Sequence, residues 1–315
     1  MKMALQIPPM TIRRRQPFLS QQQYDNYREH FNSEEAFWNI HKFESDSPEQ
    51  EASLRARHFV RSALNRITLF YTAGVEPELI GDCLEDLVRK YERCQRKMAI
   101  YEECPEISPL ALCYYPDQFE ECVQVISLCI LLQRTDLLPR FVALFDRAGY
   151  HGEDALLEAL LKHYLPERQE IDEWYHGLYT PLIEAIHATT TNAADASLKE
   201  YCEHWYSHFT HAPWKDIHLG GEEGGYVGYW AFEAGAVAYL YGMDDSAIDH
   251  MVFPKDLVEY ARREAPRPAR SLPTVEVPAS AAPLERQRLP LRKTLICLAI
   301  LGGGWRALKR RLLPG

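Results

Sequence analysis

The stretch that decides the fold is residues 47–74, SPEQEASLRARHFVRSALNRITLFYTAG. It opens with Ser47 followed by a proline and, two residues later, a glutamine, which is the pattern of a capped helix N-terminus. Its apolar side chains then recur at steps of three and four residues: Ala56, Phe59, Val60, Ala63, Ile67 and Phe70. This spacing predicts one long amphipathic helix that ends at Gly74.

The sequence on both sides of this stretch is helical in character too. Residues 24–42 and 77–97 predict amphipathic helices before and after it. Residues 122–132 are apolar nearly all round and predict a buried central helix, with Asp117 and Glu120 as its capping residues. Further helices are expected at residues 137–148, 154–165, 179–190, 193–209 and 227–241. Because no hairpin signal lies between them, the sequence predicts an all-α fold of about nine or ten helices.

Proline clusters divide the chain. Three prolines between Pro105 and Pro116 separate two groups of helices, which we expect to form two packed helical subdomains. A second cluster of six prolines indicates an extended linker, because such a composition does not bury enough surface to fold. The expected units are an N-terminal helical domain at 13–105, a C-terminal helical domain at 110–261, a linker at 262–290 and a basic amphipathic tail at 291–315.

Charge is distributed unevenly along the 315 residues, whose net charge is −10. Residues 262–315 contain twelve Lys or Arg and three Asp or Glu, whereas residues 1–261 contain 23 basic and 42 acidic side chains. An acidic body repels nucleic acid and attracts basic partners, so we expect no direct nucleic-acid binding by the globular part. For the basic tail three interpretations stay open: a frayed terminal helix, a weak membrane-surface contact, and nucleic-acid contact.

The composition, 46% hydrophobic and 25% charged, is that of an ordinary globular protein. No apolar run is long enough to cross a bilayer, and no apolar segment follows the arginines at 13–15. We therefore expect a cytoplasmic protein. The eight cysteines include no Cys-x-x-Cys pair, which indicates mostly buried thiols.

Three histidines give the one candidate metal site. His204, His208 and His211 are spaced at i, i+4 and i+7, as on one face of a helix, and such a set can hold zinc. A metal-dependent helical hydrolase is therefore the alternative function. The segment is not His-Glu-x-x-His and supplies no carboxylate as a general base, so we expect these histidines to border the core, with no metal or cofactor bound.

Acidic residues give the candidate binding surface. Between residues 216 and 259 nine acids stand against Lys255 alone. Glu222 and Glu223 lie between glycine pairs, which indicates exposure, and this Gly-rich loop lacks the Lys and Ser/Thr of a phosphate-binding loop. The residues expected to contact a basic partner are Asp216, Glu222, Glu223 and Asp249.

Several motifs in the C-terminal half belong together. They are WKDIH at 214–218, GYWAFEA at 228–234, GMDDS at 242–246 and FPKDL at 253–257. In order and spacing they resemble the PoNi family, the immunity proteins of polymorphic nuclease toxins. RQPFL at 15–19 and LFYTAG at 69–74 resemble the companion N-terminal domain, so that the resemblance covers about residues 13–260.

The resemblance implies an all-α protein that is not an enzyme. Such a protein binds a cognate DNase toxin, often a type VI secretion effector used in interbacterial competition, and neutralises it by stoichiometric complex formation, which would cover its basic active-site region. The motif residues Tyr229, Trp230, Glu233, Asp244 and Asp245 are expected to be structural, with Glu233 as a buried carboxylate and the two aspartates as turn caps with Ser246.

Overall fold

A computed structural model describes residues 14–264 of the chain. These residues form eleven α-helices and three short 3-10 helices, with no strand among them, and they confirm the all-α prediction. The linker and the basic tail lie outside the described residues from 265 onward. None of the helices in the described range combines the length and apolar character that a bilayer span requires.

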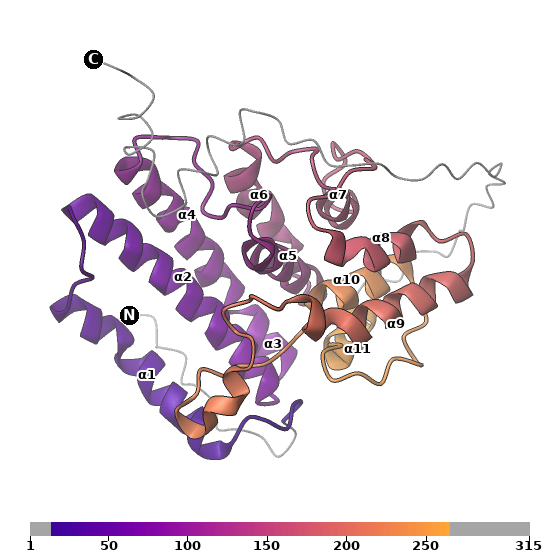
Figure 1. Cartoon of the computed structure of the whole chain (residues 1–315), viewed down its shortest axis with the longest axis horizontal. Coiled ribbons are helices and arrows are strands. Elements are labelled where there is room, and N and C mark those ends of the chain that lie inside the picture. The colour runs from indigo at the N-terminus through magenta and orange to yellow at the C-terminus, as the bar shows by residue number, and fades with distance from the viewer. Residues whose placement is uncertain (1–13, 265–315) are drawn as a thin grey trace.

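The first group of helices contains residues 47–74. α2 spans Pro48–Thr72, and the Ser47 hydroxyl accepts a hydrogen bond from the Gln50 amide at 3.1 Å, as predicted. The Gln50 side chain reaches the amide of Asp46 rather than that of Ser47. This group comprises α1 (Gln21–Ile40), α2, α3 (Pro77–Gly81) and α4 (Leu84–Tyr101), and Figure 1 shows α1, α2 and α4 side by side.

The helix expected at 77–97 is interrupted, so that prediction was wrong in one respect. α3 ends at Gly81, whose carbonyl accepts a hydrogen bond from Arg134 Nη1 at 3.2 Å instead of continuing the helical ladder. A new helix then begins at Leu84. The interruption is tolerated because a carbonyl freed at a helix end finds a side-chain donor.

The remaining helices surround α5. This helix spans Pro116–Leu131 and is buried along most of its length, as its apolar sequence predicts. Its N-cap residue is Tyr115 and makes no side-chain capping bond, so the expected cap by Asp117 and Glu120 was wrong. The other helices are α6 (Leu138–Asp146), α7 (Ala155–Leu161), α8 (Thr180–His187), α9 (Thr191–His208), α10 (Phe232–Tyr241) and α11 (Lys255–Glu264), with 3-10 turns η1 (Thr135–Leu137), η2 (Gly177–Tyr179) and η3 (Ile217–Glu223).

A single hydrophobic core joins the two groups of helices. It runs without interruption from Leu19 to Ala261, and α10 packs on α5 while α2 packs on α4. Arg57 of α2 forms a two-pronged ion pair with Glu121 of α5, at 2.5 and 2.6 Å. Of the expected linker, residues 262–264 form the last turn of α11. The seven described cysteines are thiols, five of them buried.

The N-terminal segment 14–19 ties the two ends of the described chain together. The Gln16 side chain is buried, and its amide nitrogen donates to the carbonyls of Tyr229 (2.5 Å) and Met251 (2.8 Å). Its oxygen accepts from the Tyr229 amide at 2.9 Å and from the Tyr226 hydroxyl. Arg15 adds an ion pair with Asp256 of α11 at 2.7 Å.

Candidate functional site

Glu233 organises the C-terminal motifs from inside the protein. It lies in the first turn of α10 with no exposed surface, and its Oε1 accepts hydrogen bonds from Tyr201 (2.6 Å) and Trp205 (2.8 Å) of α9. Burial raises the pKa of this carboxyl to about 7, against the hydrogen bonds, which lower it. A fully buried carboxylate is out of reach of a macromolecular partner, so Glu233 holds α10 to α9.

Tyr229 and Trp230 precede α10 instead of lying in it, which corrects the helix expected at 227–241. Gly228 has φ 138°, a backbone conformation that favours glycine, and a Cβ at this position would lie 2.2 Å from Thr72 Oγ1. Thr72 donates to the Val227 carbonyl at 2.6 Å and accepts from Trp230 Nε1 at 2.9 Å. The close approach of segment 227–230 to α2 therefore requires the glycine.

The two aspartates of the DDS motif differ in exposure. Asp244 is exposed, and its Oδ1 accepts from the Ser246 amide at 3.0 Å, which is the turn-capping contact. Asp245 is 6% exposed and pairs with Arg262 of α11 at 2.7 Å. Asp245 therefore helps to hold α11 to the turn that follows α10.

Two buried or half-buried carboxylates lie at the junction of α5 with α2 and the 209–230 segment. Glu120 accepts from Trp214 (2.8 Å) and Gln124 (2.7 Å), and burial together with the charge of Glu233 raises its pKa well above the ordinary value. Burial would raise the pKa of Glu121, but the charge and hydrogen bonds of Arg57 and the bond from the Tyr91 hydroxyl together lower it. Glu120 thus holds the aromatic segment through Trp214, whereas Glu121 holds α5 to α2 and α4.

The predicted histidine stripe is not formed. α9 ends at His208, so His211 lies beyond the helix, and that part of the interpretation was wrong. His204 and His208 stack at 5.7 Å on the exposed side of α9. Across residues 14–264, no group of three potential ligands is arranged to hold a metal ion.

The acidic residues singled out from the sequence lie in two places. Asp216 precedes η3 in a left-handed conformation (φ 61°), and its Oδ1 accepts from the Tyr206 hydroxyl at 2.5 Å. Glu222 is exposed on η3, as the flanking glycines indicated; the side chain of Glu223 is outside what the structure describes. Asp249 is exposed on the α10–α11 loop, two residues before Met251, whose carbonyl accepts from Gln16.

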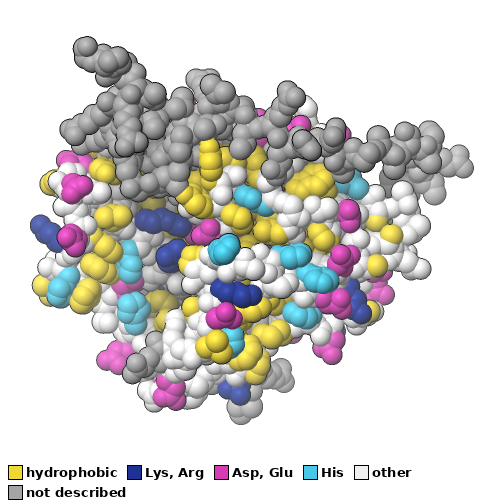
Figure 2. Space-filling model, in the orientation of Figure 1, with side chains coloured by type: hydrophobic (Ala, Val, Ile, Leu, Met, Phe, Trp, Pro, Cys, Tyr) yellow, Lys and Arg dark blue, Asp and Glu magenta, His cyan; other side chains and the backbone are white. Residues whose placement is uncertain are grey.

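Exposed apolar side chains lie beside the first of these places. Leu219 of η3 is 74% exposed, and Phe18 is 42% exposed with its ring 4.5 Å from that of His218. Gln23 of α1 fixes η3 through a bond to the Gly224 carbonyl at 2.9 Å. We call the surface formed by Phe18, Asp216, Leu219 and Glu222 the η3 face; Figure 2 shows hydrophobic and acidic side chains next to one another in the lower central region, where Figure 1 places this segment.

Sequence reasoning missed Phe18 and Leu219. Phe18 follows an arginine-rich N-terminus and reads as an ordinary core anchor, and Leu219 is a single leucine before two glycines. The available signal was the absence of any apolar residue three or four positions before or after Leu219, so that no apolar helix face includes it.

Comparison with known proteins agrees with this fold and these motifs. Residues 152–257 match the family model described as PoNe immunity proteins (PoNi), C-terminal. The match covers about a third of the chain and leaves the N-terminal half outside it. No curated protein matches the sequence.

A solved structure has the same fold. It is the crystal structure of protein PA2201 from Pseudomonas aeruginosa, with a TM-score of 0.57 and 19% sequence identity. The alignment covers 80% of this chain and 92% of that one, so the likeness includes both groups of helices. At this identity the comparison concerns the fold alone.

Proposed function

We propose that this chain is an immunity protein that binds and neutralises a nuclease toxin. The observation that carries the proposal is the match of residues 152–257 to the PoNi C-terminal family. The same motifs are the ones that build the interior around Glu233 and the Gln16 contacts, so they specify the scaffold rather than a catalytic centre.

The η3 face is the contact surface that we propose. Exposed apolar side chains surrounded by charged ones are typical of protein–protein interfaces, in which a few large side chains supply most of the binding energy. Leu219 and Phe18 supply the apolar part, and Asp216 and Glu222 supply the negative charge. Asp249 is a peripheral contact on the neighbouring loop.

The chemistry of a DNase favours such a surface. A nuclease binds phosphates, so the mouth of its active site is basic, and carboxylates facing it speed association and fix orientation. We propose that the complex covers this basic region and keeps DNA out, without turnover by the immunity protein. The cognate toxin is proposed to be a DNase delivered by type VI secretion, and neutralisation to take place in the cytoplasm of the producing cell.

Co-expression with a candidate nuclease toxin, sought in the reading frames next to this gene, tests the proposal. Cells that produce the toxin should survive with the wild-type chain and die without it. Leu219→Asp combined with Glu222→Lys should abolish protection, because it places an unpaired carboxylate in the apolar part and reverses the neighbouring charge. Glu106→Lys is the matched control: Glu106 is exposed in the loop after α4, and its reversal should leave protection intact.

Two results would contradict the proposal. Survival without any physical complex would show that protection does not come from binding. Equal protection by the double variant and the Glu106→Lys control would show that the η3 face is not the contact surface.

A further inference from the structure

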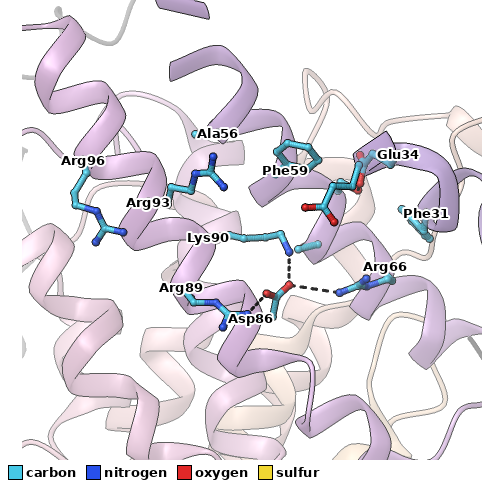
Figure 3. Close-up of a pocket in the computed structure, with 13 residues that line it drawn as sticks. Phe31, Glu34, Ala56, Phe59, Arg66, Asp86, Arg89, Lys90, Arg93 and Arg96 are labelled. Atoms are coloured by element: carbon cyan, nitrogen blue, oxygen red, sulfur yellow. Dashed lines mark hydrogen bonds and ion pairs between the residues drawn. The ribbon is translucent and has the colours of Figure 1, made fainter. Parts of the chain in front are cut away.

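A cavity of about 570 Å³ lies between α1, α2 and α4. Figure 3 shows its lining, with Arg93 extending from α4 toward Ala56 of α2 and with Phe59 opposite. Five cationic side chains line it: Arg66, Arg89, Lys90, Arg93 and Arg96. We call this site the α4 groove.

The acidic side chains in the α4 groove are largely occupied. The Asp86 carboxylate is shared by Lys90, Arg89 and, at 3.7 Å, Arg66. Glu34 is turned to other partners, since it accepts from His58 (2.8 Å) and Ser62 (2.7 Å). Glu35, the third acid, is exposed at the rim. One carboxylate therefore serves three cations, and the groove keeps an excess of positive charge.

The excess is concentrated on one face of α4. Arg89, Arg93 and Arg96 follow one another at i, i+4 and i+7, and neither Arg93 nor Arg96 has an ion pair within residues 14–264. On the facing helix, Arg66 has a buried Nε atom with no hydrogen-bond partner among the described residues. In a chain of net charge −10, Arg93 and Arg96, which have no ion pair within residues 14–264, line the same groove as Arg66 of α2, and this concentration of guanidinium groups suits an anionic ligand.

The helix dipole does not explain this arrangement. The last turn of α4 contains no basic side chain, and the favourable interaction of cations with a helix C-terminus falls off within that turn. That effect also has no bearing on the residues that other helices contribute to the same cavity. Among these are Phe31 of α1 and Phe59 and Arg66 of α2. The combination of cations and rings is thus a property of the groove and not of the helix.

We infer that the α4 groove binds a nucleotide, with its phosphates on Arg89, Arg93 and Arg96 and its base against Phe31 and Phe59. Guanidinium groups match phosphate oxygens in a two-pronged geometry, and half-buried rings offer an apolar face to a base. The volume falls within the range of small-molecule sites and exceeds what phosphate alone needs. This site is separate from the η3 face and does not depend on the proposed function.

Calorimetric titration of the full-length chain with ADP, tripolyphosphate and adenosine tests the inference. At about 50 mM salt we expect saturable binding of ADP, weaker binding of tripolyphosphate and none of adenosine. Arg93→Ala with Arg96→Ala should weaken ADP binding at least about tenfold. Arg147→Ala, which removes an exposed arginine outside the groove, should leave it unchanged.

A second variant tests the role of the rings. Phe59→Leu should weaken ADP while leaving tripolyphosphate unaffected, and circular dichroism of each variant checks its fold. Absence of ADP binding at about 1 mM, or equal binding by the double arginine variant, would overturn the inference. Tripolyphosphate binding as tight as ADP, or binding of a single-stranded oligonucleotide without any ADP binding, would overturn the nucleotide assignment.

Discussion

At the scale of single residues, the molecule depends on polar groups buried with partners. Glu233 is the central one: one of its oxygens takes two donors from α9, whereas Oε2 is buried with no partner in the described residues. A protonated carboxyl is the form that this environment favours, in keeping with a pKa raised to about 7 by burial. The carboxyl therefore retains its proton in the folded state at a pH where the unfolded chain has lost it.

This difference makes stability depend on pH. The folded-state pKa lies above the ordinary value of 4.5, so the stabilisation is fully present below about pH 4.5 and is lost as the pH rises through about 7. The loss amounts to roughly 3 kcal/mol. Glu233→Gln keeps the acceptor for Tyr201 and Trp205 but does not titrate. Its free energy of unfolding can be measured by urea denaturation at about pH 4.5 and 8. Between these pH values it should decline by about 3 kcal/mol less than that of the wild type.

An exposed glutamate provides the control for this experiment. Glu259→Gln on α11 should leave the pH dependence as it is in the wild type, because Glu259 is exposed. If Glu233→Gln also retains the full decline of stability with pH, titration of the Glu233 carboxyl is not the cause of that decline.

At the scale of helices, contact distance between α10 and its neighbours is set by Gly235. A Cβ at this position would lie 2.6 Å from Pro254 Cγ, 3.1 Å from Val258 Cγ2 and 3.3 Å from Leu131 Cδ1. Gly235→Ala should therefore push α11 away from α10 and destabilise the protein by about 1–3 kcal/mol. Denaturant unfolding measures this change.

Gly177→Ala is the matched substitution, because a Cβ there meets nothing within 4 Å. We expect its effect on the free energy of unfolding to stay within about 0.5 kcal/mol. Equal effects of the two substitutions would show that close helix packing at Gly235 is not what limits its replacement.

Helix spacing made most of this fold predictable from the sequence. The apolar period placed α2, α5 and α9 within a few residues. The predictions that were wrong concern helix boundaries that depend on contacts with residues far away along the chain. The start of α10 is fixed by the contact of segment 227–230 with Thr72, and the break before α4 is stabilised by Arg134, neither of which local periodicity reveals.

The candidate site was predictable only in its charge. Exposure of Glu222 could be expected because glycine pairs flank Glu222 and Glu223. The apolar half of the η3 face depends on where segment 14–19 lies, and that is decided by the Gln16 contacts with Tyr229 and Met251, more than two hundred residues away along the chain. Likewise, the α4 groove arises only when Arg66 of α2 faces the arginines of α4.

At the scale of the whole molecule, two surfaces of opposite character are carried on one continuous core. The η3 face presents apolar and acidic groups, whereas the α4 groove presents guanidinium groups and rings. A negatively charged body orients a basic partner toward the first of these as the two approach. Association with a basic nuclease should accordingly become slower as salt is added, since screening shortens the reach of this attraction.

The most direct measurement of the central claim is the stoichiometry and affinity of the purified complex with a catalytically inactive form of the candidate nuclease toxin. We expect one immunity protein per toxin by light scattering, with an association rate that falls with salt and an affinity lowered at least about tenfold by Leu219→Asp with Glu222→Lys. A nuclease that remains fully separate from the folded wild-type chain, at concentrations of about 10 μM of each, would contradict the account.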